Sequence, residues 1–571
     1  MIFKKILFLK EKNMLDFARD KAFWARVRTS DEFAQHRREV KELYDTSFGK
    51  EKPRPHTADE ILNENDRGIW RLQFDHLQSS ALLSLIYPEN EEYYSSLLEA
   101  VWAYLNDYTW APLGHYTEQY YGKTPKDFDF GLIDIFAASA SFALAEIKSL
   151  FRDRFPKLLI DRITYEIRRR TIEPYLSRKF FWETHDNNWT AVCAGAVGSV
   201  LMYEEPALFF ENQERLHGAM ECYLASYKDD GMCVEGVGYW SFGFGFFAAY
   251  AMLEREITGG AVDWFTRPKV KEISKFIGKM FLQKNVMATY SDSAIGSRYN
   301  VGLPHMLRSV YGDEVEKLPI EHGIVVHDNT HFNFALRSFI YYKAENNATE
   351  MATDVTYTVK NSCYFTKRTP SYGFTVKGGN NGESHNHVDV GTFILARNNK
   401  QIIADIGAGQ YLPGYHTKER YTFFNPSSYA HSIPMFDGIG EDDIARDDAF
   451  VAYDPEKSIA SLDFPQAYGV DFLKKAHREF ALESDKITLT AEFELTEEKE
   501  ITERFISVIE PKIVGGVVII DDVTLVQAEG IVPKISQKTA TRHLDGSPYH
   551  VYLIDYIVPK GQTRFEIQFN M

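Results

Sequence analysis

The hydrophobic pattern of this chain changes its period near residue 350. Up to about residue 345, apolar residues recur every three or four positions over long segments, the spacing of helices that bury one face. Pro88-Glu89-Asn90 separates the first two segments, which predicts an antiparallel helix pair. Paired helices must bury their apolar faces on neighbouring pairs, and the absence of a fixed-period repeat favours a closed ring over a regular solenoid. The predicted helices cover 69–87, 91–107, 131–152, 158–176, 188–203, 206–227, 239–257 and 264–283.

The second half of the chain has the two-residue alternation of β-strands. A polar stretch at 344–350 precedes it. Predicted strands, separated by turn residues, are Val355–Thr366, Tyr372–Val376, Thr392–Ala396, Ile487–Glu494, Val517–Leu525 and Thr563–Asn570. Helices followed by strands, and not alternating with them, predict two domains in series. We expect a helical domain over 1–347 and an antiparallel β-sheet domain over 348–571.

Composition narrows the class of protein. The net charge of −17 argues against nucleic-acid binding, because phosphate neutralisation needs an excess of Lys and Arg. The four cysteines show no C-x-x-C spacing, so reduced thiols are expected. The N-terminal apolar run from Ile6 to Leu9 is shorter than the ~7–15 apolar residues of a secretion signal. No run approaches the ~20 apolar residues that cross a bilayer. We therefore expect a soluble cytoplasmic protein, not a periplasmic or secreted one, with no membrane partner.

The densest group of chemically versatile residues lies in the second half, at 383–391. This run contains His385, His387 and Asp389. If it is extended, the two histidines point off the same strand face. Downstream, Asp405 and His431 join His387 to give two imidazoles and one carboxylate, a set that suits zinc or a similar divalent ion. The alternative interpretation is a set of hydrogen-bonded strand histidines.

Two segments of the helical half look like helix openings. In His185-Asp186-Asn187-Asn188-Trp189, an Asn or Asp can cap the helix that follows. In the segment 235–240, Glu-Gly-Val-Gly-Tyr-Trp, glycines allow a sharp backbone turn before an aromatic-rich helix. Capping accounts for one asparagine, and core packing would account for Tyr239.

Together these segments resemble the heparinase II/III-like polysaccharide lyases. The resemblance rests on Asn-Asn-Trp at 187–189, Glu-Gly-Val-Gly-Tyr-Trp at 235–240 and His-Asn-His-Val-Asp-Val-Gly-Thr-Phe at 385–393, in that order. It implies an incomplete α/α toroid followed by an antiparallel, β-sandwich-like sheet domain. It also implies catalytic roles for Asn188, Tyr239 and His385, and one divalent metal ion held by His387, Asp405 and His431. Zinc is expected, with manganese or calcium as alternatives, in a structural role.

The implied reaction is β-elimination in a uronate polysaccharide, either a glycosaminoglycan or alginate. A base removes the C5 proton and the 4-linked oxygen leaves, which gives a 4,5-unsaturated uronate. Asn188 would neutralise the substrate carboxylate, with His185 as a second donor, because the enolate-like charge needs hydrogen-bond donors. Tyr239 would act as acid, and as base for one epimer if basic neighbours lowered its pKa; His385 is the base for the other. Alginate-cleaving relatives often have a histidine where this chain has Trp189, so the main carboxylate partner, His185 or Asn188, stays open.

The acidic chain needs a basic cleft to bind a polyanion. Arg298 is the candidate basic residue of that cleft; the alternative is a surface ion pair between Arg298 and Asp292. Trp189 is a candidate for stacking against a sugar ring. Two other enzyme classes stay open. An iron(II) oxygenase would use a triad of His387, Asp389 and His431, and a glycoside hydrolase would use Glu235 and Asp186. A sugar-binding protein without activity is a further alternative.

Overall fold

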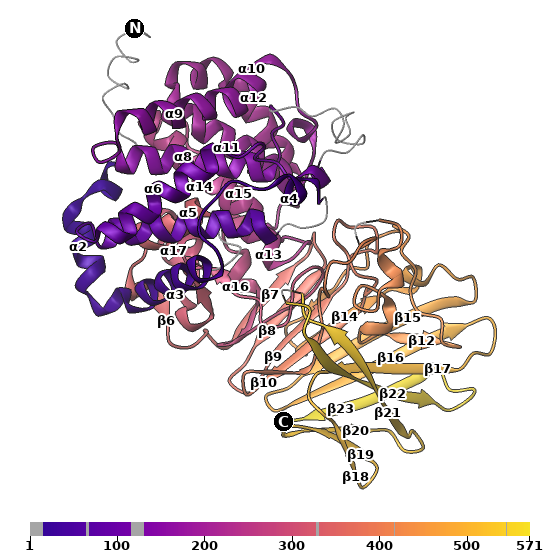
Figure 1. The fold of residues 1–571 in the computed structure, drawn as a ribbon. Helices are drawn as coiled ribbons and strands as arrows, with labels where there is room; N and C mark the ends of the chain where they lie inside the picture. The colour runs from indigo at the N-terminus through magenta and orange to yellow at the C-terminus, as the bar shows by residue number, and fades with distance from the viewer. Residues whose placement is uncertain (1–14, 64–67, 116–130, 327–330, 416, 544) are drawn as a thin grey trace.

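The protein has helices in its first half and sheets in its second (Figure 1). The computed structural model describes residues 15–63, 68–115, 131–326, 331–415, 417–543 and 545–571. The predicted absence of a secretion signal concerns residues outside these ranges. Within them, no helix combines the length and apolarity needed to cross a membrane. The four cysteines are free thiols, and only Cys222 is not fully buried.

The helices confirm the predicted series of paired elements. Asn90 opens one of them by accepting a hydrogen bond from the backbone N–H of Glu92 (2.9 Å), and Asp134 opens another through Ala137 N–H (2.7 Å). The main helices are α2 (Lys21–Thr29), α3 (Ala34–Lys50), α4 (Ala58–Leu62), α5 (Gly68–Ile86), α6 (Glu91–Leu105), α8 (Ile135–Phe151), α9 (Lys157–Ile167), α10 (Glu173–Ser177), α11 (Asn188–Glu204), α12 (Pro206–Ala225), α13 (Val237–Tyr239), α14 (Gly245–Ile257), α15 (Pro268–Ser274), α16 (Phe276–Met280), α17 (Gly302–Tyr311) and α18 (Phe332–Ile340).

One inner helix, α11, organises the helical half around the site. It is buried from Thr190 to Met202 and packs against α8, α12 and α14. A helix that is apolar all round belongs inside a domain. The predicted helix 239–257 is interrupted by a π-helical segment, η7 (Trp240–Phe244), directly after α13. Such segments are frequent at functional sites.

Three antiparallel sheets form most of the second half (Figure 1). The first, in strand order, contains β11 (Lys400–Ile403), β10 (Phe393–Arg397), β9 (Gly373–Lys377), β8 (Tyr364–Arg368) and β7 (Val355–Val359). The second contains β12 (Pro434–Phe436), β17 (Ile501–Ser507), β22 (Pro548–Val558) and β21 (Pro533–Thr541). The third contains β13 (Ala452–Asp454), β14 (Ile459–Asp463), β15 (Leu473–Leu482), β16 (Lys486–Leu495), β23 (Arg564–Asn570), β20 (Val523–Gln527), β19 (Val517–Ile520) and β18 (Lys512–Val514). Strands of all three sheets share one hydrophobic core.

Two predicted strands are wrong in extent. Val355–Thr366 is the hairpin β7–β8, and Val517–Leu525 is the hairpin β19–β20. Polar residues mark both turns, Lys360-Asn361-Ser362 in the first and Asp521-Asp522 in the second, and the predicted strands run across them. The turns contain Cys363 and Asp521, both with positive φ (62° and 56°), which is uncommon for residues other than glycine.

A segment between α16 and α17 is built into the first sheet region. It forms β1 (Phe281–Gln283) and β2 (Val286–Met287), and β1 packs near β8, β9 and β10. The hydroxyl of Tyr290 donates to the Thr375 carbonyl (2.9 Å), and the Thr289 hydroxyl donates to the Asp405 carbonyl (2.5 Å). Contacts of the two halves therefore begin well before residue 348, and the predicted division at 347/348 stays a prediction.

Candidate active site

The segment 383–391 is an irregular loop between β9 and β10, not the extended strand that we considered. His385 has a φ of 53°, in the left-handed region that few side chains other than glycine adopt. His385 and His387 nevertheless converge, because both imidazoles reach the carboxylate of Asp292. The predicted strand is therefore wrong, but the two histidines do lie close together.

Asp292 is the centre of this cluster, and its side chain is fully buried. Its carboxylate lies 2.7 Å from His385 Nδ1 and 3.3 Å from His387 Nε2. Arg420 Nη2 donates to it at 2.6 Å, and the Tyr415 hydroxyl at 3.4 Å. Burial acts to raise the pKa of Asp292, but the histidine hydrogen bonds and the Arg420 charge outweigh it and hold the pKa well below its usual range. Asp292 is therefore a carboxylate that fixes the Nδ1–H tautomer of His385, with the lone pair on Nε2.

Hydrogen bonds from buried polar groups hold the loop 383–391 in place. Lys377 Nζ donates to Asp389 Oδ1 (2.5 Å) and to Asn386 Oδ1 (2.8 Å). Glu441 Oε2 accepts from the backbone N–H of Val390 (2.9 Å). Burial raises the pKa of Glu441 to about 8. The loop thus has two buried acidic supports: Asp389, which is paired with Lys377, and Glu441, for which the described residues include no cation within ion-pair distance.

Tyr239 comes from the helical half and lies on the His385 ring. The ring centroids are 4.1 Å apart with an interplanar angle of 31°, and the Tyr239 hydroxyl lies 3.3 Å from the Tyr411 hydroxyl. The turn before Tyr239 requires Gly236: its φ is 104°, and an added Cβ would lie 2.2 Å from Ser293 Oγ. Burial raises the pKa of Tyr239, and the Asp292 charge adds to the rise. Tyr239 is therefore protonated at neutral pH, which suits an acid.

Asn188 is the first residue of α11, and its neighbour Asn187 is the cap. Asn187 Oδ1 accepts from the Trp189 backbone N–H (3.1 Å), so the Asn188 side chain is not used for capping. An added Cβ on Gly243 would lie 3.2 Å from Asn188 Cβ. Gly243 follows Tyr239 by four residues through the π-helical segment η7, which is about one helical turn. Asn188 thus lies about one turn along from Tyr239.

The other predicted substrate residues, His185, Trp189 and Arg298, contact groups outside this cluster. His185 is exposed, and its Nδ1 lies 2.7 Å from the Phe181 carbonyl. Trp189 packs against the rings of Phe181 (5.4 Å) and His115 (5.1 Å). Arg298 contacts Glu39 (3.5 Å) and the Gly323 carbonyl. The alternative pairing of Arg298 with Asp292 is wrong, since Asp292 pairs with Arg420. The role of Arg298 in substrate binding stays a prediction.

A possible metal group lies directly behind the loop. His387, Asp405 and His431 are buried, and their candidate ligand atoms all lie within 4.8 Å of one another. His431 Nδ1 lies 2.9 Å from Asp405 Oδ2. Among the described residues, His387 Nδ1 and His431 Nε2 are buried without a hydrogen-bond partner, which a bound ion would explain. Burial lowers the pKa of His387 despite the Asp292 hydrogen bond, which favours the neutral, ligating imidazole. The donor set fits zinc.

The iron-oxygenase interpretation is wrong in its ligand set. It requires Asp389 beside His387 and His431, but Asp389 is paired with Lys377. Asp405 takes its place among the described groups. Sequence spacing cannot distinguish Asp389 from Asp405 as the ligand, because each lies within 26 residues of His387 or His431.

Asp292, Arg420, Tyr411 and Tyr415 were not predicted as site residues. Asp292 entered only as an alternative partner for Arg298. Its true partners His385 and Arg420 are 93 and 128 residues away in the chain. No local pattern marks such pairs.

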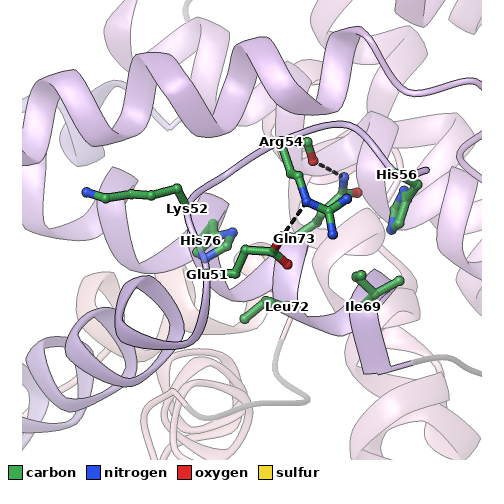
Figure 2. A pocket seen from close by; sticks show the side chains of 8 residues that line it. All are labelled: Glu51, Lys52, Arg54, His56, Ile69, Leu72, Gln73 and His76. Atoms are coloured by element: carbon green, nitrogen blue, oxygen red, sulfur yellow. Dashed lines mark hydrogen bonds and ion pairs between the residues drawn. The ribbon is translucent and has the colours of Figure 1, made fainter. Parts of the chain in front are cut away.

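A hollow in the helical half is too small to bind a substrate. Figure 2 shows a hollow lined by helical-half residues that include Arg54, Glu51 and Gln73. Its volume of about 10 Å³ holds no more than a water molecule. Arg54 is already paired with Glu51 and Glu60, each at 2.6 Å. This hollow offers no room for a substrate.

No known protein family matches the sequence, and no curated protein matches it either. Solved structures do match. Heparan sulfate lyase HepC from Pedobacter heparinus, as a mutant, has a TM-score of 0.59 at 13% identity, covering 93% of this chain and 82% of its own. Heparinase III has a TM-score of 0.56 at 14% identity, covering 88% and 76%. The chondroitin AC lyase of Streptomyces coelicolor A3, in complex with chondroitin sulphate, has a TM-score of 0.58 at 9% identity, covering 97% and 82%. The predicted fold is therefore confirmed: this chain has the polysaccharide-lyase-like fold of a helical toroid followed by antiparallel β-sheets.

Proposed function

We propose that this protein is a polysaccharide lyase that cleaves a uronate-containing polysaccharide by β-elimination. The observation that carries the proposal is the contact between Tyr239 and His385, with Asp292 behind the histidine. A phenol from the helical half and an imidazole from the sheet half thus meet at one point. The shared fold with heparan sulfate and chondroitin lyases supports the same conclusion.

His385 would be the base in this reaction. Asp292 holds its Nδ1–H, so Nε2 can take the C5 proton of the uronate. The electron pair of the C–H bond forms the C4–C5 double bond. The C4–O bond breaks, and its electron pair stays on the leaving oxygen. The positive charge that then forms on His385 is stabilised by the Asp292 carboxylate.

Tyr239 would protonate the leaving oxygen. The raised pKa of Tyr239 supports this acid role and disfavours a role as base. Asn188 would donate its amide N–H to the substrate carboxylate, whose charge grows as the proton leaves. His185, also near the start of α11, is the second proposed donor, and Trp189 is the proposed sugar platform. Each acid or base group is worth about 10²–10⁴-fold in rate.

His387, Asp405 and His431 would hold one divalent ion, most simply zinc. When bound, that ion supplies a fixed positive charge and a cross-link between the loop and the sheet. Asp292 supports His387 from its other ring nitrogen, as a carboxylate commonly does for a metal-bound histidine. We propose a structural role for this ion.

The test is a panel of uronate polymers: heparan sulfate, chondroitin sulfate, hyaluronan and alginate. Each is incubated with the wild-type protein and with the Tyr239→Phe variant, and ultraviolet absorbance reports the unsaturated uronate. We expect absorbance to rise with at least one polymer for the wild type only. Reducing ends that appear without absorbance would indicate hydrolysis, favour the Glu235 and Asp186 alternative, and refute the lyase.

A further inference from the structure

A hollow in the sheet half lies beside the candidate active site. Its volume is about 380 Å³, within the ~300–1,000 Å³ range of small-molecule sites. Three of its lining residues are on β22, one follows β21, and two come from the segments after β17 and after Asp292. The residues are Tyr549, His550, Tyr552, Arg542, Val508 and Ile295.

The lining combines aromatic rings with the guanidinium group of Arg542. The Arg542 guanidinium lies over the Tyr549 ring, 5.2 Å from its centroid. Within the described part of the chain, no carboxylate lies in ion-pair distance of Arg542, although Asp545 is near enough to feel its charge. In a chain with a net charge of −17, such an arginine is available for an external anion. Half-buried tyrosines supply flat faces with polar edges, which suit a sugar ring.

The hollow is connected to the candidate active site through one hairpin. His543 follows Arg542, and its ring lies 4.3 Å from that of Tyr411. Its Nδ1 lies 3.0 Å from the Gly409 carbonyl. Tyr411 in turn contacts the Tyr239 hydroxyl. Consecutive Cα atoms are ~3.8 Å apart, so Arg542 is a close neighbour of residues that contact the catalytic tyrosine.

We propose that this hollow is a second sugar-binding subsite, which takes an acidic sugar unit of the polymer that is cleaved at Tyr239 and His385. The inference rests on the proposed function. Arg542 pairs with the carboxylate or sulfate of that unit, and Tyr549 and Tyr552 contact its ring. A short substrate that fills only the catalytic position does not reach the hollow.

The first test compares Arg542→Gln with a control, Arg564→Gln, an exposed arginine of the same half that lies on β23. Rates are measured on long chains and on tetrasaccharides of heparan sulfate and of chondroitin sulfate. Loss of a charge-assisted hydrogen bond weakens binding about tenfold or more, so we expect KM for the long chain to rise by about that factor. The values of kcat, and KM for the tetrasaccharide, should stay at wild-type levels. Equal KM increases in both variants would overturn the subsite, because general charge would then explain them.

The second test needs no catalysis. Long heparan sulfate and chondroitin sulfate chains are titrated by calorimetry into the Tyr239→Phe protein, with and without Arg542→Gln. Weaker binding with Arg542→Gln supports the subsite even if the wild type forms no unsaturated product, in which case only the lyase proposal fails. Unchanged binding together with wild-type cleavage kinetics in Arg542→Gln overturns the subsite and leaves the lyase intact. Tyr552→Ala, which leaves every charge in place, should weaken the same binding.

Discussion

Replacing Asp292 by Asn tests the core of the proposed mechanism. An amide has nearly the same size as the carboxylate, but its NH₂ group cannot accept the Nδ1–H of His385. The imidazole would then prefer the tautomer with the proton on Nε2, the nitrogen that must act as base. We expect kcat to fall by about 10²–10⁴-fold, the worth of a general base, with KM changed much less.

The same substitution should also reduce stability, because Arg420 loses the charge of its buried partner. Arg420 keeps hydrogen bonds to the Asn386 and His385 carbonyls, both at 3.0 Å. Breaking a buried ion pair costs about 3–5 kcal/mol, so the folded state must be verified by calorimetry at the assay temperature.

Asp389→Asn is the matched control for this experiment. Asp389 is also a buried carboxylate with a cationic partner, Lys377, but it does not contact His385. We expect this variant to lose stability and to keep most of its kcat while folded. A folded Asp292→Asn protein that forms unsaturated product within about threefold of the wild-type rate would refute the role given to Asp292.

Three further predictions follow from other groups of the site. Tyr239→Phe should lower kcat by about 10²-fold or more, while the unfolding temperature changes little, because the hydroxyl lost is bonded only to Tyr411 among the contacts described, at 3.3 Å; a large loss of stability with normal kcat would contradict it. His431→Ala should abolish stoichiometric zinc binding, measured by elemental analysis, and speed hydrogen exchange in the loop 383–391; full zinc occupancy would exclude His431 as a ligand. Glu441 should make stability fall as pH rises, because its pKa is about 8 in the folded protein against an ordinary value near 4.5. Between those values the unfolded chain releases the proton and the folded one retains it, at a slope of up to about 1.4 kcal/mol per pH unit. Glu441→Gln should flatten the stability curve between about pH 5 and 8, and an unchanged curve would mean that this group does not titrate as inferred.

The sequence predicted the order of elements because periodicity is a local property. The helix at 188–203 and its cap follow from residues within one turn of each other, and the structure has α11 at Asn188–Glu204 with Asn187 as its cap. The reversal at Asp521 was missed because the strands on its two sides are short and were taken as one, although Asp521 and Asp522 interrupt the apolar residues. In the site, Tyr239 and His385 were proposed through their motifs. Asp292 was missed as their partner because its contacts span nearly a hundred residues.

The segment 281–300 has a practical consequence for engineering. It belongs to the helical half by sequence, yet its hydrogen bonds run to Thr375, Asp405 and Ala408 on the other side. Asp292, the partner of the proposed base, lies within it. A chimera that joins this toroid to another sheet domain at residue 348 would therefore separate Asp292 from both of its histidines. A chimera should therefore take residues 281–300 and the sheet domain from the same parent, so that the base and its orienting carboxylate stay in register.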